Sequence, residues 1–200
     1  MRRRACETAN MPIALPIHDW PLPYEARLEQ RPLRTIDLVV IHCTELPDMK
    51  TAREFGERIH YPEKQTGNSG HYYIDSDGTI HRFVADNRVA NHTFGYNQRS
   101  IGIEMANIGR YPYWGDSQHQ QFTLAYTKPQ IDALLALLRQ LRHGLPNLTY
   151  IAGHEDLDRR LEPARDDPNI MLPRRQDPGP LFPWQDVVPA GGLQRLIPPK

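Results

Sequence analysis

The chain has 200 residues, of which 39% are hydrophobic and 24% are charged, a composition that suits a single globular domain with one core. Basic and acidic residues number 24 each, so no basic surplus indicates a nucleic-acid partner and no acidic surplus indicates disorder. No apolar run approaches the roughly 18 residues of a membrane-spanning helix, so a soluble protein without a transmembrane segment is expected.

Proline and cysteine usage suggests how the chain is organised. The 19 prolines gather in residues 12–32 and 163–199, which predicts a proline-rich wrapping segment over 1–34, a domain over 35–188 and a tail over 189–200. The basic start Met1-Arg2-Arg3-Arg4 is not followed by an apolar stretch, so a cytoplasmic location is expected, with the periplasm or secretion by another route left open. Two cysteines, Cys6 and Cys43, cannot form a disulfide framework, and a buried, reduced thiol is expected at Cys43.

The first half of the chain predicts a strand, a helix and a hairpin. Residues 35–42 contain the apolar run of a buried strand, and residues 50–60 follow with Ala52, Phe55 and Ile59 at helical spacing. Residues 71–84 form two strand-like runs joined through Asp77-Gly78, a dipeptide that favours a tight hairpin because glycine accepts positive φ.

The second half adds a strand and the clearest helix. Residues 101–105 alternate so that the apolar side chains share one face and Glu104 points to the other. Thr127 is a suitable N-cap for a helix whose apolar stripe (Ile131, Leu134, Leu135, Leu138 and Leu141) runs to a stop at His143-Gly144. The order of elements predicts a single α/β domain with a mixed central β-sheet flanked by helices.

Two histidines and an aspartate stand where ordered elements end, in the contexts VVIHCT, IAGHEDLD and RRQDPGP. A catalytic zinc ion takes three protein ligands, commonly imidazole and carboxylate, and keeps a fourth position open. His42, His154 and Asp177 meet that requirement, so a Zn²⁺ site is predicted. For Asp177 the competing interpretation is an Asx turn before Pro178-Gly179.

Taken in order, VVIHCT, SGHYYIDSDGTIHRFV, RVANHTFGYNQRSIGIEMAN, IAGHEDLD and DPGPLFPW resemble the zinc-dependent N-acetylmuramoyl-L-alanine amidases of type 2, a family related to peptidoglycan recognition proteins. The resemblance covers roughly residues 35–188 and implies the peptidoglycan amidase/recognition-type fold. It implies His42, His154 and Asp177 as metal ligands and Glu104 as the catalytic glutamate. Arg175 stands where many members have lysine, and residues 159–173 resemble an insertion expected to shape the peptide side of the groove. His71, His92 and Asn97 are expected to line the substrate groove.

The activity implied by the resemblance is hydrolysis of the amide between N-acetylmuramic acid and L-alanine in peptidoglycan or muropeptides. Zinc would activate water, Glu104 would act as general base, and Arg175 with zinc would stabilise the oxyanion. Two alternatives remain open: a non-catalytic module that binds muramyl peptides, and an antibacterial amidase toxin. Cell-wall recycling is favoured by the expected location, while anhydro and ordinary muramic ends, the stem-peptide preference and the oligomeric state stay open.

Overall fold

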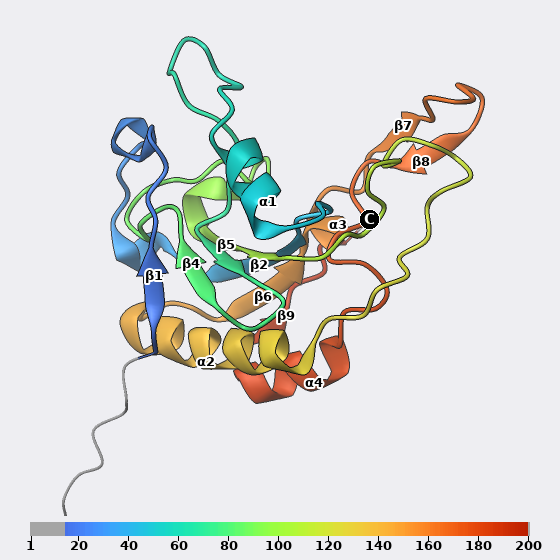
Figure 1. The fold of residues 1–200 in the computed structure, drawn as a ribbon. Coiled ribbons are helices and arrows are strands. Elements are labelled where there is room, and N and C mark those ends of the chain that lie inside the picture. Colours follow the sequence, from blue (N-terminus) through green and yellow to red (C-terminus); the bar gives the residue numbers. More distant parts are fainter. Residues whose placement is uncertain (1–14, 200) are drawn as a thin grey trace, which may run out of the picture.

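A seven-stranded sheet forms the centre of the molecule (Figure 1). The computed structural model describes residues 15–199. Residues 1–14 of the predicted wrapping segment, which include Cys6, lie outside that range. Its strand order is β1-β4-β3-β5-β2-β6-β9, and every neighbouring pair is parallel except the β3-β4 hairpin. The strands are β1 (Ile17–Asp19), β2 (Leu38–Cys43), β3 (Tyr72–Ile74), β4 (Ile80–Arg82), β5 (Ser100–Met105), β6 (Tyr150–Gly153) and β9 (Gln194–Arg195).

Helices flank the sheet on both faces. Figure 1 shows α2 (Lys128–Gly144) and α4 (Trp184–Gly191) together on one face, with α1 (Met49–Gly56) on the opposite side. The remaining helical elements are α3 (His154–Leu157) and the 3-10 turns η1 (Glu25–Arg27), η2 (Leu33–Thr35) and η3 (Asn97–Arg99). The predicted mixed sheet with flanking helices is therefore confirmed.

The local signals behave largely as expected. Thr127 caps α2 in a reciprocal capping box with Gln130, and Gly78 takes φ +89° in the β3-β4 turn. Helix α1 differs from its prediction because it ends at Gly56, and Ile59, expected on its apolar stripe, is 42% exposed.

Strand alternation divides the sheet into two differently packed faces. On one face, Val39, Ile41, Ile103 and their neighbours pack against the leucines of α2. The opposite face carries smaller clusters and the polar side chains described below. Glu104 thus lies on the sheet face opposite the main apolar layer, as strand alternation predicted. That face carries the cavity described below, which α1 and the surrounding loops border.

The sheet extends beyond the predicted domain limits of 35–188. The segment expected to wrap the domain supplies β1, which pairs with β4, and the expected tail supplies β9, which pairs with β6. Both are edge strands of three residues or fewer, too short for a recognisable period-two pattern. No helix within residues 15–199 combines the length and apolarity needed to span a bilayer.

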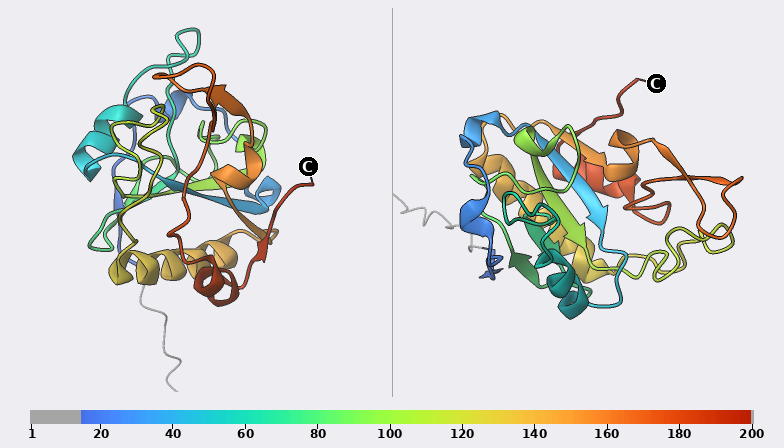
Figure 2. Two further views of the ribbon diagram at one scale, coloured as in Figure 1. Left: turned by 90° about the vertical axis from the view of Figure 1, so that its right-hand side faces the viewer. Right: turned by 90° about the horizontal axis from the view of Figure 1, so that it is seen from above.

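A two-stranded hairpin projects from the body between α3 and Asp177. Its strands are β7 (Leu161–Pro163) and β8 (Met171–Pro173), paired antiparallel. Figures 1 and 2 show this hairpin beside the long loop that connects β5 to α2. The loop and hairpin are joined by hydrogen bonds from Ser117 to Asp166 and from the Arg165 amide to the Gly115 carbonyl. Residues 159–173, which resembled an insertion, therefore form a paired hairpin that is docked against the β5-α2 loop.

Candidate functional site

The three predicted metal ligands converge at the carboxyl ends of neighbouring parallel strands. His42 is the penultimate residue of β2, His154 directly follows β6, and β2 and β6 are paired. Asp177 follows the β7-β8 hairpin, and its carbonyl accepts a hydrogen bond from the Glu155 amide just after His154. This edge of an open α/β sheet is where ligand sites characteristically form.

The donor atoms of these three residues fit a zinc ion. Nδ1 of His42 and Nδ1 of His154 lie 2.9 and 3.1 Å from the same oxygen of Asp177, and the three ligand atoms fall within 4.8 Å of one another. Tetrahedral zinc with bonds of about 2.0–2.1 Å separates its ligand atoms by about 3.3 Å. Small side-chain adjustments would therefore admit the metal, and the two-imidazole, one-carboxylate set suits it chemically.

The surroundings of His42 and Asp177 keep both side chains in the protonation states that bind metal. Desolvation lowers the pKa of His42 to about 4, although the hydrogen bond to Asp177 opposes this shift. Desolvation opposes ionisation of Asp177, but the two neighbouring histidines outweigh it and hold its pKa well below the usual range. A neutral imidazole and an ionised carboxylate are the ligand forms a cation requires.

A second layer of hydrogen bonds orients His42. Its Nε2 lies 3.0 Å from Nδ1 of His92, whose Nε2 lies 3.2 Å from the hydroxyl of Ser100. A metal on Nδ1 of His42 would leave the ring proton on Nε2, from which it is donated to His92. His92 in turn donates to Ser100, whose hydroxyl donates to the Tyr96 carbonyl. This chain fixes the ring and tautomer of His42.

Glu104 lies beside the ligand set on the next strand. In the β2-β5 ladder it is the direct partner of His42, so both side chains rise from the same face of the sheet. No hydrogen bond to its carboxylate is found among the described residues. Burial, with the negative charge of Asp177 as a second cause, raises the pKa of Glu104 to about 8, and Arg175 opposes the shift. A cation held by the ligands would lower this pKa toward the range of a general base.

Arg175 reaches the same cavity from the segment before Asp177. Its Nε is buried without a hydrogen-bond partner, and within residues 15–199 its guanidinium forms no ion pair. Its charge is close enough to affect the pKa values of both Glu104 and His42. An unpaired buried donor at this place is available to an anionic group.

The cavity around these groups has a volume of about 550 Å³. Its walls come from β2 and the loop after it, α1 and the loop that follows, residues 91–97, the β5-α2 loop and the β7-β8 hairpin. His92 and Asn97 are part of the lining, but both are engaged by the protein: the Asn97 side chain accepts from the amides of His92 and Thr93. These contacts favour a supporting role, and direct substrate contact by either residue stays a prediction.

His71 does not line the cavity, which corrects its predicted role. It is fully buried, its Nδ1 accepts from the Gly102 amide, and its Nε2 lies 3.1 Å from the Arg88 carbonyl. Both ring nitrogens are therefore used within the protein. Because β3 lies inside the sheet beside β5, the start of that strand is covered, and His71 braces the backbone instead of meeting substrate.

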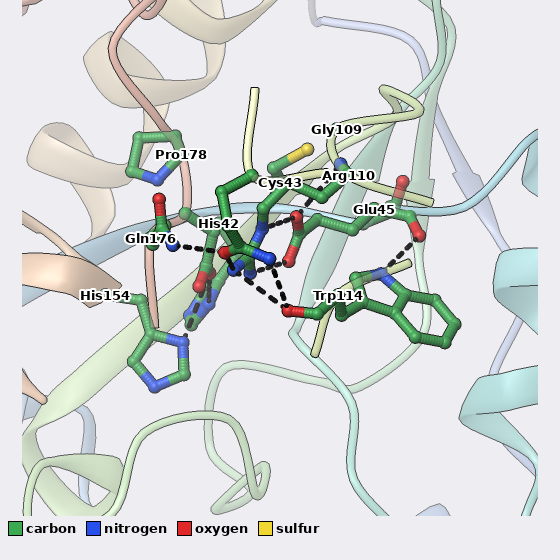
Figure 3. A network of polar contacts seen from close by, with 12 residues as sticks. His42, Cys43, Glu45, Gly109, Arg110, Trp114, His154, Gln176 and Pro178 are labelled. Atoms are coloured by element: carbon green, nitrogen blue, oxygen red, sulfur yellow. Dashed lines mark hydrogen bonds and ion pairs between the residues drawn. The ribbon is translucent and has the colours of Figure 1, made fainter. Parts of the chain in front are cut away.

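A buried ion pair underlies the cavity and was not predicted (Figure 3). Arg110 forms a two-pronged contact with Glu45, at 2.7 and 2.6 Å, and its other nitrogen bonds to Gln120. Gln120 also accepts from Gln176, the residue between Arg175 and Asp177. The network thus links the loop after β2 to the segment that carries Asp177. Glu45 and Arg110 are 65 residues apart, and nothing in their local sequence indicates the pairing.

The fold and the site together place three buried residues that could hold a metal ion, an adjacent carboxylate and a neighbouring arginine in one cavity at the edge of an α/β sheet. The sequence pattern of the N-acetylmuramoyl-L-alanine amidase family matches residues 32–180. The chain therefore belongs to this enzyme family, as its motifs implied.

Individual relatives agree with that assignment. The chain is 32% identical over 97 residues to the N-acetylmuramoyl-L-alanine amidase AmiD of Escherichia coli K12; the match covers 48% of this chain and only 29% of AmiD. Among solved structures, the amidase LysC of Clostridium intestinale URNW has a TM-score of 0.64 at 24% identity, covering 90% of this chain and 99% of LysC. A complex of E. coli AmiD with anhydro-N-acetylmuramic acid-L-Ala-D-gamma-Glu-L-Lys has a TM-score of 0.59 at 23% identity, covering 82% of this chain and 59% of that one. At these identities the structural likeness concerns the fold.

Proposed function

We propose that this protein hydrolyses the amide between the lactyl group of N-acetylmuramic acid and the L-alanine of a peptidoglycan stem peptide, with zinc held by His42, His154 and Asp177. The observation that carries the proposal is the meeting of this ligand set with Glu104 in one cavity of a chain that belongs to the amidase family. A muramyl-peptide-binding module needs no such carboxylate beside the ligands.

Zinc bound at this set would supply Lewis acidity, which acidifies water and polarises an amide carbonyl. Glu104, whose carboxylate has no hydrogen-bond partner among the described residues, would accept the proton from the attacking water and return it to the departing amine. Burial favours the protonated form of Glu104 and a bound cation would favour the ionised form, so both forms that the two transfers require would be within reach.

Arg175 would stabilise the negative charge that develops on the carbonyl oxygen. Its buried, unpartnered Nε supports this role, because such a donor needs no reorganisation when the charge appears. A guanidinium stays protonated at all relevant pH values, so Arg175 is assigned to charge stabilisation and not to proton transfer.

The test is release of free stem peptide from a defined anhydro-muramyl tripeptide and from its ordinary muramyl counterpart. Zinc-loaded protein should cleave at least one, whereas chelator-treated protein and the Glu104→Gln variant should not. Glu104→Gln should still bind zinc, because the residue is not a ligand. Removing Arg175 as Arg175→Ala should lower kcat by about 100-fold or more, the effect of losing one oxyanion donor.

Each other outcome has a definite meaning. Binding of both muramyl peptides without cleavage by zinc-loaded protein would replace the enzyme with the binding module. Neither binding nor cleavage would direct the search to another amide, including the targets of a toxin.

A further inference from the structure

The β7-β8 hairpin presents an unpaired arginine to the cavity. Four arginines line this space: Arg110, Arg165, Arg174 and Arg175. Arg110 pairs with Glu45, and Arg174 pairs with both Asp158 and Glu162. Arg175 lies near the reacting groups, as described above. Arg165 remains, and within residues 15–199 its guanidinium has neither an ion pair nor a hydrogen bond.

The backbone around Arg165 is fixed on both sides. Its amide donates to the Gly115 carbonyl at 2.7 Å, and the next residue, Asp166, accepts from the Ser117 amide and hydroxyl at 2.8 and 2.6 Å. The hairpin and the β5-α2 loop are therefore docked where Arg165 emerges. The side chain of Arg165 is exposed, but the fixed backbone holds its base in place, so less freedom is lost when it binds an anion.

The stem of Arg165 lies directly over Gly115. A Cβ at position 115 would stand 2.9 Å from Cγ, Cδ and Nε of Arg165, closer than these atoms can approach. The absence of a side chain at Gly115 thus creates the space in which Arg165 extends across the cavity wall. Gly115 has no unusual backbone requirement, since its φ is not in the positive region. Substitution by alanine would therefore act through Arg165.

We propose that Arg165 binds the free α-carboxylate of the second stem residue, a γ-linked D-glutamate, and so makes the protein selective for stem peptides that carry a negative charge there. This rests on the proposed function. The ligand crystallised with AmiD contains D-gamma-Glu, and a γ-linked glutamate keeps its α-carboxylate free two residues from the amide to be cleaved. A guanidinium is well matched to that group.

The charge distribution of the cavity favours the hairpin as the peptide side. On the far wall, α1 and the following loop contribute Phe55, His60, Tyr61 and Asn68 and no Asp, Glu, Lys or Arg side chain, a surface suited to a sugar. On the hairpin wall, Glu162 is neutralised by Arg174, and Arg165 leaves a net positive charge. An anionic peptide is therefore attracted to the hairpin and a neutral sugar to the opposite wall.

The experiment compares two substrates that differ in one group: anhydro-N-acetylmuramic acid-L-Ala-D-gamma-Glu-L-Lys and its analogue with the D-glutamate α-carboxylate converted to a carboxamide. The kcat/KM of the full chain should be about 10- to 100-fold higher for the acid, the effect of a hydrogen-bonded charge pair. Arg165→Gln should bring this ratio close to one by slowing cleavage of the acid alone. Gly115→Ala should lower the ratio in the same way, whereas Arg159→Gln, an exposed arginine at the hairpin base that does not line the cavity, should preserve it.

Equal kcat/KM for the two substrates in the unmodified protein, or a ratio that survives Arg165→Gln, would overturn the proposal. Zinc-dependent cleavage of both would at the same time leave the proposed function intact. If neither substrate is cleaved, the proposed function fails, and the role of Arg165 is then decided by calorimetric affinities of the acid and the amide. A preference for the acid that Arg165→Gln abolishes supports the proposed role of Arg165. Equal affinities for the acid and the amide reject that role.

Discussion

The hydrogen-bond chain behind His42 should set the affinity of the centre for zinc. His92→Leu removes the acceptor 3.0 Å from Nε2 of His42 and leaves that N-H in a buried position. An unsatisfied buried donor costs about 1–3 kcal/mol. The hydroxyl of Thr93, 3.4 Å from the same nitrogen, offers a poorer acceptor and reduces the loss. The expected result is a zinc affinity lowered by about 10-fold, at the small end of the range for outer-shell partners.

The assay is competition for zinc between the folded protein and a chromophoric chelator, with circular dichroism to verify the fold. His92→Asn is the matched control, because its side-chain oxygen can take the place of Nδ1 and should restore most of the affinity. Ser100→Ala should have a smaller effect in the same direction, since it acts one bond further away. A folded His92→Leu protein that binds zinc as tightly as the parent would refute this reasoning.

Three further predictions concern stability, each read from urea unfolding. Burial raises the pKa of Glu104 from its usual value to about 8. In the metal-free protein, ionising this residue therefore lowers the free energy of unfolding as pH rises between the two values. Glu104→Gln avoids this loss, so between about pH 5 and about pH 8 its free energy of unfolding should rise by up to about 4 kcal/mol relative to the parent. A relative stability that does not change with pH would contradict this burial effect. Arg110→Met leaves the buried Glu45 carboxylate unpaired and should lower the free energy of unfolding by about 3–5 kcal/mol. Adding Glu45→Gln removes that charge and should recover much of the loss. A double variant as unstable as Arg110→Met would rule out an unpaired charge as the cause. Leu138→Ala in the fully buried stripe of α2 should cost about 2–5 kcal/mol, against almost nothing for exposed Arg139→Ala, and similar losses for both would argue against this packing.

Much of the fold and the ligand set could be predicted because the relevant signals are local. The apolar run of β2, the Asp77-Gly78 turn and the Thr127 cap each depend on a few neighbouring residues. The proposed ligands were found because each stands at the end of an ordered element, and parallel strands bring their carboxyl ends to one edge. Assignment of Glu104 to the face away from α2 followed from strand alternation alone.

Other features depended on contacts between segments far apart in the chain. His71 and His92 look alike in sequence, and their rings lie 5.6 Å apart, but packing engages both nitrogens of His71 with backbone groups and places His92 against His42. The short edge strands β1 and β9 exist because longer neighbours offer them free backbone groups to pair with. No pattern in the sequence marks these positions, because what defines them is a partner supplied by the fold.

The sequence by itself determined which residues can bind a metal or move a proton, since that is a property of side-chain chemistry and local context. Only the tertiary structure decided which charges are neutralised. It pairs Arg110 with Glu45 and Arg174 with Glu162, and it leaves Arg165 extended over Gly115. The physical reason is that Coulomb and hydrogen-bond energies depend on distance in space, and separation along the chain does not fix that distance.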